Sequence, residues 1–130
     1  MLASIHLRHC ELRGIVVIVT SGWRSPDEQM NLFAKGRQMD PATGVWNIVD
    51  RRLVVTNAMP NEAPHCRGAA YDICPLVAEK PAWDRLDLFQ AVAECRPSEL
   101  AWGGAWQGNF KDHPHFELFN WRNLPLKDTL

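Results

Sequence analysis

Two segments that lie far apart in the chain carry histidine and carboxylate side chains, and they place the strongest constraint on how it folds. The first carries His65 and Asp72, and the second carries Asp112 and His115. A hydrolytic zinc ion keeps three protein ligands of these types and leaves one position to water, whose pKa falls to about 7. Four such groups supply three ligands and one base. The sequence therefore predicts a fold that brings the two segments to one site.

The first segment is suited to bring its two ligands together. Gly68 lies between His65 and Asp72, where a chain that doubles back needs a residue tolerant of positive φ. An extended segment after Gly68 would place Ala70, Asp72 and Cys74 on one face. Because Ala70 is small, we expect room beside Asp72 for an ion and its water.

The second segment offers two histidines, of which only one can join the site. His113 and His115 alternate along the chain, so on an extended segment they point to opposite sides. Pro114 favours an extended conformation at His113, and residues 116–119 have the pattern of a strand. We expect His115 to be the ligand, with His113 as the alternative. A single histidine more often lies on the surface or in the core, so the prediction depends on the set.

The size and charge of the chain exclude several classes of protein. With 130 residues and 46% hydrophobic content, we expect residues 1–130 to form a single domain. A net charge of -1 with intermixed signs argues against a nucleic-acid or anionic-membrane partner. Residues 1–11 are too polar for a signal peptide. We expect synthesis in the cytoplasm, no stable membrane association and a monomer.

The cysteines have neither the spacing of a zinc knuckle nor the density of a disulfide scaffold, which indicates free thiols. They are Cys10, Cys66, Cys74 and Cys95. Cys66 and Cys74 flank the predicted ligands, so contact with the metal is the alternative for these two.

The first part of the chain alternates between helical and extended patterns. Residues 2–13 predict a helix closed by Gly14, and the β-branched run 15–20 predicts a strand buried on both faces. A helix capped by Ser25 would then continue until Gly36. Arg24 precedes it at a strand-to-helix junction, where its side chain either projects over a site or lies on the surface.

Residues 37–61 are the least regular part of the chain. After a turn at 40–44, residues 45–49 and 53–55 have the pattern of a hairpin. This hairpin would either rim a substrate groove or lie on the surface away from it.

The last part predicts a helix and an aromatic region. Residues 81–95 have an apolar face at helical spacing. A glycine pair between Trp102 and Trp106 would let the main chain approach a peptide or glycan, unless both indoles belong to the core. We expect residues 120–130 to form a tail packed by Trp121 or frayed at its end.

Four motifs in this order resemble a known family of zinc peptidases. They read SGWRSPDEQ, PHCRGAAYD, WGGAW and DHPHFEL, and the resemblance spans residues 12–119. The family includes D-alanyl-D-alanine carboxypeptidases and dipeptidases, and the chain is most similar to L-alanyl-D-glutamate endopeptidases of phage lysis and wall remodelling. The resemblance implies an α+β fold, shared with the hedgehog signalling domain, whose central antiparallel sheet is flanked by helices.

The resemblance also implies a role for each site residue. In such enzymes one motif supplies two zinc ligands, which correspond to His65 and Asp72 here. A later motif supplies the base and the third ligand, which correspond to Asp112 and His115. An arginine that steadies the substrate carbonyl corresponds to Arg24.

Three positions depart from the family pattern. Ala63 stands where serine is usual, Trp23 where tyrosine is commoner, and Ala105 where similar enzymes tend to have aspartate. None of them removes a predicted ligand or the base. We therefore expect them to affect which substrate is preferred and which residues hold the metal ligands in place.

From the residues and the resemblance together we expect a zinc-dependent hydrolase of peptidoglycan stem peptides that cuts between L-Ala and D-Glu. Asp112 would act as the base and Arg24 would stabilise the oxyanion. An endolysin-like enzyme of this kind reaches the wall after release from the cell. The alternatives are D-Ala-D-Ala carboxypeptidase or dipeptidase activity, and a zinc-bearing binding domain without catalysis.

Overall fold

A sheet of five strands forms the centre of the computed structural model, which describes residues 2–108 and 111–127. Four strands follow the order β1-β4-β7-β6, and β5 pairs with β4. Each of these pairings is antiparallel. The strands are β1 (Val17–Ser21), β4 (Ala70–Val77), β5 (Lys80–Pro81), β6 (Leu100–Trp102) and β7 (His115–Leu118). The longest strand, β4, therefore lies between β1 and β7.

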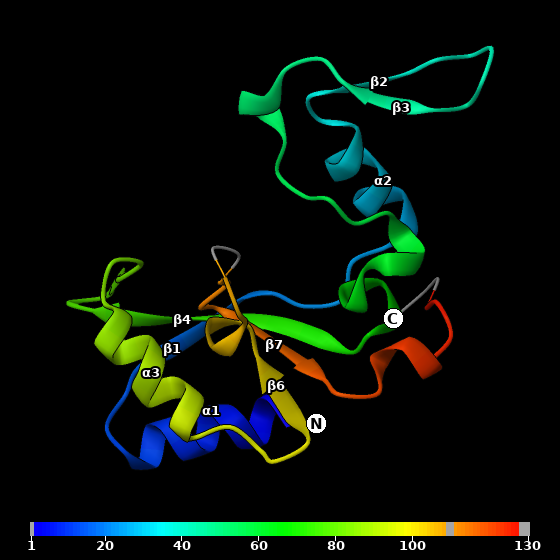
Figure 1. Cartoon of the computed structure of the whole chain (residues 1–130). Coiled ribbons are helices and arrows are strands. Elements are labelled where there is room, and N and C mark those ends of the chain that lie inside the picture. The colour runs from blue at the N-terminus through cyan, green and yellow to red at the C-terminus, as the bar shows by residue number, and fades with distance from the viewer. Residues whose placement is uncertain (1, 109–110, 128–130) are drawn as a thin grey trace.

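Two helices cover one face of this sheet (Figure 1). They are α1 (Leu2–Leu12) and α3 (Leu86–Glu94). The core lies between these helices and the sheet, and it includes the fully buried Ile73, Phe89 and Phe116. Burial of such side chains contributes roughly 1.5–3 kcal/mol each, so this face provides much of the stability of the fold.

A buried histidine joins both helices to the central strand. His6 of α1 is fully buried. Its Nδ1 lies 2.8 Å from the Tyr71 hydroxyl, and its Nε2 lies 2.8 Å from the Val92 carbonyl oxygen. Because both ring nitrogens have partners, the imidazole is accommodated in the core without an unsatisfied polar atom. This histidine has a structural role.

The segment between β1 and β4 lies on the opposite side of the sheet from α1 and α3 (Figure 1). It contains α2 (Pro26–Ala34) and a hairpin of β2 (Arg37–Met39) and β3 (Trp46–Ile48). The Ser25 side chain accepts a hydrogen bond from the main-chain N–H of Glu28 at 3.1 Å, which caps α2 as the sequence predicts. The chain then returns to the sheet through short 3-10 helices.

The α+β class with a central antiparallel sheet and flanking helices is confirmed. The first helix ends at Leu12, and Gly14 follows it with φ of 75°, in the left-handed conformation expected of a closing glycine. Among the helices of residues 2–108 and 111–127, none has the length and apolar character needed to cross a membrane.

The prediction that the strand at residues 15–20 is buried on both faces is wrong. The strand begins at Val17 and forms an edge of the main sheet, since β4 is its one partner there. Ile18 and Val19 are 39% and 42% exposed. An apolar run indicates a strand but does not indicate how many neighbouring strands it has. In addition, α1 and α3 cover only one face of the sheet, so neither of these helices covers the side chains on the other face of β1.

The prediction of a hairpin between 45–49 and 53–55 is also wrong. The pairing is between β2 and β3, and the turn at residues 40–44 connects them. The Asp40 side chain accepts a hydrogen bond within this turn, and Gly44 takes φ of 71°. Residues 51–53 form a 3-10 helix instead of a turn between strands.

Two further boundaries differ from the prediction. The helix expected from residue 81 begins at Leu86, because Pro81 pairs with β4 as part of β5. In the C-terminal tail, Trp121 is 4% exposed and packs as expected. The end of that tail, residues 128–130, lies outside the described residues.

Candidate metal centre and its pocket

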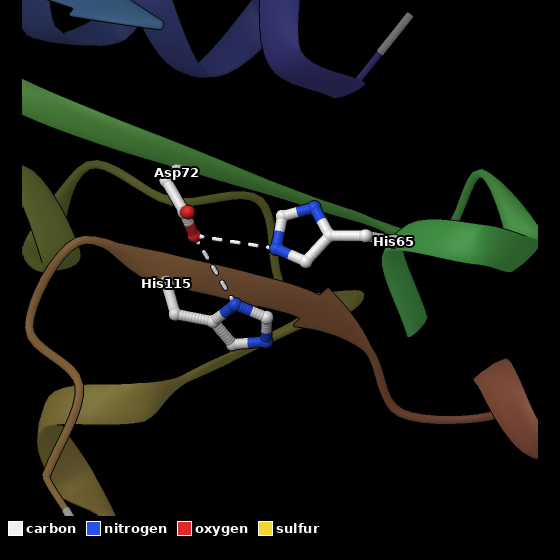
Figure 2. A group of neighbouring side chains, drawn as sticks. All are labelled: His65, Asp72 and His115. Carbon is white, nitrogen blue, oxygen red and sulfur yellow. Dashed lines mark hydrogen bonds and ion pairs between the residues drawn. The ribbon is translucent and has the colours of Figure 1, made fainter. Parts of the chain in front are cut away.

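Three side chains with metal-binding atoms meet on the face of the sheet opposite α1 and α3. His65 comes from a 3-10 helix, Asp72 from β4 and His115 from β7, and Figure 2 shows them pointing toward one another. Oδ1 of Asp72 lies 3.5 Å from Nε2 of His65 and 3.2 Å from Nδ1 of His115. One ligand atom from each residue lies within 4.8 Å of the others. This geometry is compatible with a single bound metal ion.

The backbone explains why these residues meet. Asp72 and His115 are register partners across β4 and β7, so their side chains share one face of the sheet. Gly68 ends the 3-10 helix of His65 with φ of 65°, and β4 begins two residues later. A glycine adopts this left-handed turn with little strain. The predicted convergence of the two segments is thus found, and so is the predicted reversal at Gly68.

Each imidazole has its outer nitrogen bonded to an acceptor. Nδ1 of His65 lies 2.8 Å from the carbonyl oxygen of Gly22, which can only accept, so Nδ1 carries the proton and Nε2 faces the cluster. Nε2 of His115 lies 2.8 Å from Oε1 of Glu117, which leaves Nδ1 facing Asp72. Metal-binding histidines usually have such partners, which fix the tautomer and the ring orientation.

The charges of the cluster favour a cation. Burial alone would raise the pKa of Asp72, but hydrogen bonds from His115 and His65 hold the pKa of this carboxyl well below its usual range. Burial alone would lower the pKa of His115, but hydrogen bonds to Asp72 and Glu117 raise it to about 9. The metal-free site therefore holds a proton at neutral pH, in the place that a metal ion would take.

Asp112 lies beside the cluster without taking part in it. It lines the same pocket, and its main-chain N–H donates to the Gly103 carbonyl oxygen at 3.1 Å. Partial desolvation raises the pKa of Asp112, although the charge of His115 opposes this. A carboxylate that is not a ligand and has a raised pKa is suited to accept and return a proton.

The glycine pair makes room for neighbouring parts of the chain. A Cβ atom on Gly103 would collide with the main chain of Asp112, and one on Gly104 would collide with the Trp102 ring. Trp102 is 9% exposed, whereas Trp106 lines the pocket with its ring centroid 5.3 Å from that of His115. One indole therefore belongs to the core and the other to the pocket wall.

Arg24 lines the pocket, in agreement with the first of its two predicted positions, projection over a site. Its Nη1 donates to Oε1 of Gln29 at 2.9 Å and its Nη2 to the Ser21 hydroxyl at 3.2 Å. Gln29 is 1% exposed, and its Nε2 donates to the Ala58 carbonyl oxygen at 2.7 Å. These partners are uncharged, so they hold the guanidinium in place and leave its charge available.

The alternative ligands do not join the cluster. His113 packs against the rings of Phe89 and Trp102, with ring centroids 6.2 and 6.0 Å away. Cys66 and Cys74 are buried free thiols. Among the described residues, His65, Asp72 and His115 are the grouped side chains that could hold a metal ion.

Sequence reasoning missed Glu117 and Gln29 as supporting residues. A signal for Glu117 was present, because residues two apart on a strand share a face and Glu117 follows His115 by two. Gln29 gave no such signal, since its role depends on how α2 packs against the loop at Ala58. Both residues line the pocket.

The pocket is larger than the metal cluster. Its volume is about 1100 Å³, and it continues along the returning loop at residues 55–64 to Trp121 and Arg122. The irregular segment 37–61 thus contributes its last residues to the rim, while the β2–β3 turn does not line the pocket. Such a volume has room for a ligand much larger than a single ion.

Comparisons with known proteins found similar sequences. A family model described as D-alanyl-D-alanine carboxypeptidase matches residues 56–118. The peptidoglycan L-alanyl-D-glutamate endopeptidase CwlK of Bacillus subtilis (strain 168) is 29% identical over 116 residues, which cover 82% of this chain and 62% of that protein. The chain thus spans about three fifths of the length of this curated relative.

A solved structure has a similar fold. The L-Ala D-Glu endopeptidase ChiX of Serratia marcescens matches with a TM-score of 0.57 and 23% sequence identity, over 92% of this chain and 79% of that chain. At this identity the likeness is one of fold. The names of this enzyme and of the Bacillus subtilis relative specify the same kind of peptide bond.

Proposed function

We propose that this chain is a member of the family of D-alanyl-D-alanine carboxypeptidases and L-alanyl-D-glutamate endopeptidases, and that it is a zinc-dependent hydrolase of peptidoglycan stem peptides. The bond we assign to it lies between L-Ala and D-Glu, the bond named for CwlK and for the structurally similar ChiX. We assign the metal ligands to His65, Asp72 and His115, the base to Asp112 and the stabilisation of the oxyanion to Arg24.

The observation that carries the proposal is the convergence of His65, Asp72 and His115 on one point. Two imidazole nitrogens and one carboxylate oxygen fit zinc, which accepts these donors and in catalytic sites keeps a fourth position for water or substrate. When bound, zinc polarises a carbonyl group and lowers the pKa of a coordinated water to about 7. The hydrogen bonds to Gly22 and Glu117 orient the two imidazoles for this task.

Two further residues carry out the proton and charge chemistry. Asp112 accepts a proton from the attacking water and returns it to the leaving amine, for which its raised pKa is suited. Arg24, held by Gln29 and Ser21, donates hydrogen bonds to the oxyanion that develops on the scissile carbonyl. In this division one carboxylate, Asp72, stays with the metal, and the other changes its protonation state.

A digest of purified peptidoglycan tests the proposal. Metal-depleted protein and the same protein with zinc restored are incubated with the wall, and the products are identified by mass spectrometry. We expect new N-terminal D-Glu with zinc and none without it. The Asp112→Asn variant should bind zinc and yield no product, which separates loss of the base from loss of the metal.

The same digest tests the second candidate activity, which the description of the matching family model favours. Release of free D-Ala without new N-terminal D-Glu would assign the protein as a D-Ala-D-Ala carboxypeptidase. If the zinc-loaded protein releases neither product and still binds the wall, it is a binding domain and the catalytic assignment fails.

We also propose an endolysin-like setting, in which the protein reaches the wall after release from the cytoplasm. The support is the resemblance of its four motifs to phage lysis enzymes. Expression in a bacterial cytoplasm should leave cells intact until a pore-forming protein is co-expressed. Lysis without the pore would contradict this setting.

A further inference from the structure

One wall of the pocket contains the guanidinium groups of Arg67 and Arg122, and both pack on the indole of Trp121. Cζ of Arg122 lies 4.3 Å from the centroid of the Trp121 ring, and Cζ of Arg67 lies 5.6 Å from it. All three residues line the pocket. Cation–π contacts place a planar guanidinium at a defined position on a ring. The pocket therefore has two positive charges at fixed places on this wall.

Carboxylates do not neutralise these charges within the described residues. The Arg67 side chain donates to the carbonyl oxygens of Asn61, at 2.7 Å, and Leu124. None of the ion pairs of the described residues involves Arg67 or Arg122. Nε of Arg67 and Nε1 of Trp121 are buried N–H donors with no acceptor in this part of the chain. The wall thus has a surplus of positive potential.

Three of the four carboxylates that line the pocket have partners away from Arg67 and Arg122, and the fourth, Asp112, lies beside the metal cluster. Asp72 accepts from both imidazoles of the metal cluster, and Glu117 bonds to His115. Glu62 accepts from the main-chain N–H of Met59 at 3.3 Å. Within residues 2–108 and 111–127, no carboxylate pairs with Arg67 or Arg122, so a negative group of a molecule that enters the pocket has two cations to bind.

We propose that Arg122, Arg67 and Trp121 form a subsite for a free carboxylate of the peptide substrate. The proposal rests on the proposed function, and it names the glutamyl residue next to the scissile amide as the carrier of this group. A glutamyl residue has two carboxyl groups; the continuing chain uses one and leaves the other free. A guanidinium binds a carboxylate through two parallel hydrogen bonds. Arg122, which is exposed, makes this contact, and Arg67 adds charge behind it.

Two synthetic peptides test the subsite. Both contain the L-Ala–D-Glu bond, and they differ in whether the free carboxyl of the glutamyl residue is a carboxylate or a primary carboxamide. For the zinc-loaded protein we expect kcat/KM to be about tenfold higher for the carboxylate, the low end for one hydrogen bond between charged groups. Arg122→Gln should bring the ratio of the two values close to one. Arg122→Lys, which keeps the charge without the planar fork, should give an intermediate ratio.

Arg8→Gln is the matched control, because Arg8 is an exposed arginine of α1 that does not line the pocket. It should keep the wild-type ratio. If the wild type treats both peptides equally, or if Arg122→Gln keeps the tenfold ratio, the subsite is refuted and the hydrolase proposal stands.

A binding measurement separates the two proposals further. The affinity of both peptides is measured by calorimetry for zinc-loaded Asp112→Asn, with and without Arg122→Gln. If the wild type cleaves neither peptide, the proposed function fails. The subsite is still supported in that case if the carboxylate peptide binds tenfold more tightly than the carboxamide peptide and Arg122→Gln removes this difference. Equal affinities for the two peptides refute the subsite.

Discussion

Replacement of Glu117 by alanine should weaken zinc binding without removing a ligand. Glu117 and His115 are both largely buried, and the 2.8 Å contact between Oε1 and Nε2 fixes the ring so that Nδ1 faces Asp72. Loss of such a partner typically costs 10- to 100-fold in metal affinity, which is about 1.4–2.7 kcal/mol. Glu117→Gln retains an acceptor oxygen and loses the charge, so its loss of affinity should be smaller than that of Glu117→Ala.

Proton competition makes the size of this effect depend on pH. The pKa of His115 in the metal-free site is about 9, so at pH 7 zinc has to displace a proton, which lowers the apparent affinity by about 100-fold. Glu117→Ala removes one of the hydrogen bonds that raise this pKa and thereby reduces the competition. At pH 7 this gain offsets part of the lost affinity. Above pH 9 the proton is absent and the full loss remains.

The assay is competition for zinc with a chromogenic chelator between pH 7 and pH 10. We expect the ratio of dissociation constants, Glu117→Ala over wild type, to rise across this range. Glu99→Ala, a change at an exposed glutamate that does not line the pocket, is the control and should leave the ratio near one. A dissociation constant for Glu117→Ala within twofold of wild type at pH 10 would refute the reasoning.

Three further predictions concern the support of the site. Gln29→Leu removes one of the two acceptors of Arg24, so kcat should fall by about tenfold or more with little change in zinc affinity, measured by peptide cleavage and chelator competition. Gly103→Ala forces the main chain of the proposed base to move and should lower both the melting temperature and kcat, whereas Gly22→Ala, whose Cβ meets open space, should change unfolding free energy by less than about 0.5 kcal/mol. In metal-free protein, the raised pKa of His115 gives stability that is complete below pH 6.5 and lost as the pH rises through 9. The free energy of unfolding, measured with urea, should therefore be lower at pH 9.5 than at pH 6.5, by on the order of 3 kcal/mol at most. Equal free energies at the two pH values would contradict this.

The parts of the site that follow from short-range rules could be predicted from the sequence. The turn at Gly68 depends on local backbone geometry, and the structure has it. The cap at Ser25 is of the same kind. These features need no knowledge of which elements pack together. His115 faces the cluster as predicted, but His113 lies in a turn before β7 and not on the extended segment that the alternation assumed.

The parts that depend on long-range packing could not be predicted in this way. The exposure of Ile18 follows from the edge position of β1, and the late start of α3 follows from the pairing of Pro81 with β4. The role of Gln29 depends on a contact with Ala58, far along the chain. In each case the partner is set by topology, which hydrophobic periodicity does not encode.

Neighbouring residues of β4 face opposite sides of the sheet, and this has a consequence for engineering. Tyr71 bonds to His6 in the core, while the next residue, Asp72, bonds to both imidazoles. A core substitution that displaces β4 by a few tenths of an ångström also moves the carboxylate. Libraries selected for heat resistance at His6 or Tyr71 will therefore also change the geometry of the candidate metal site, and screens of such variants should record both properties together.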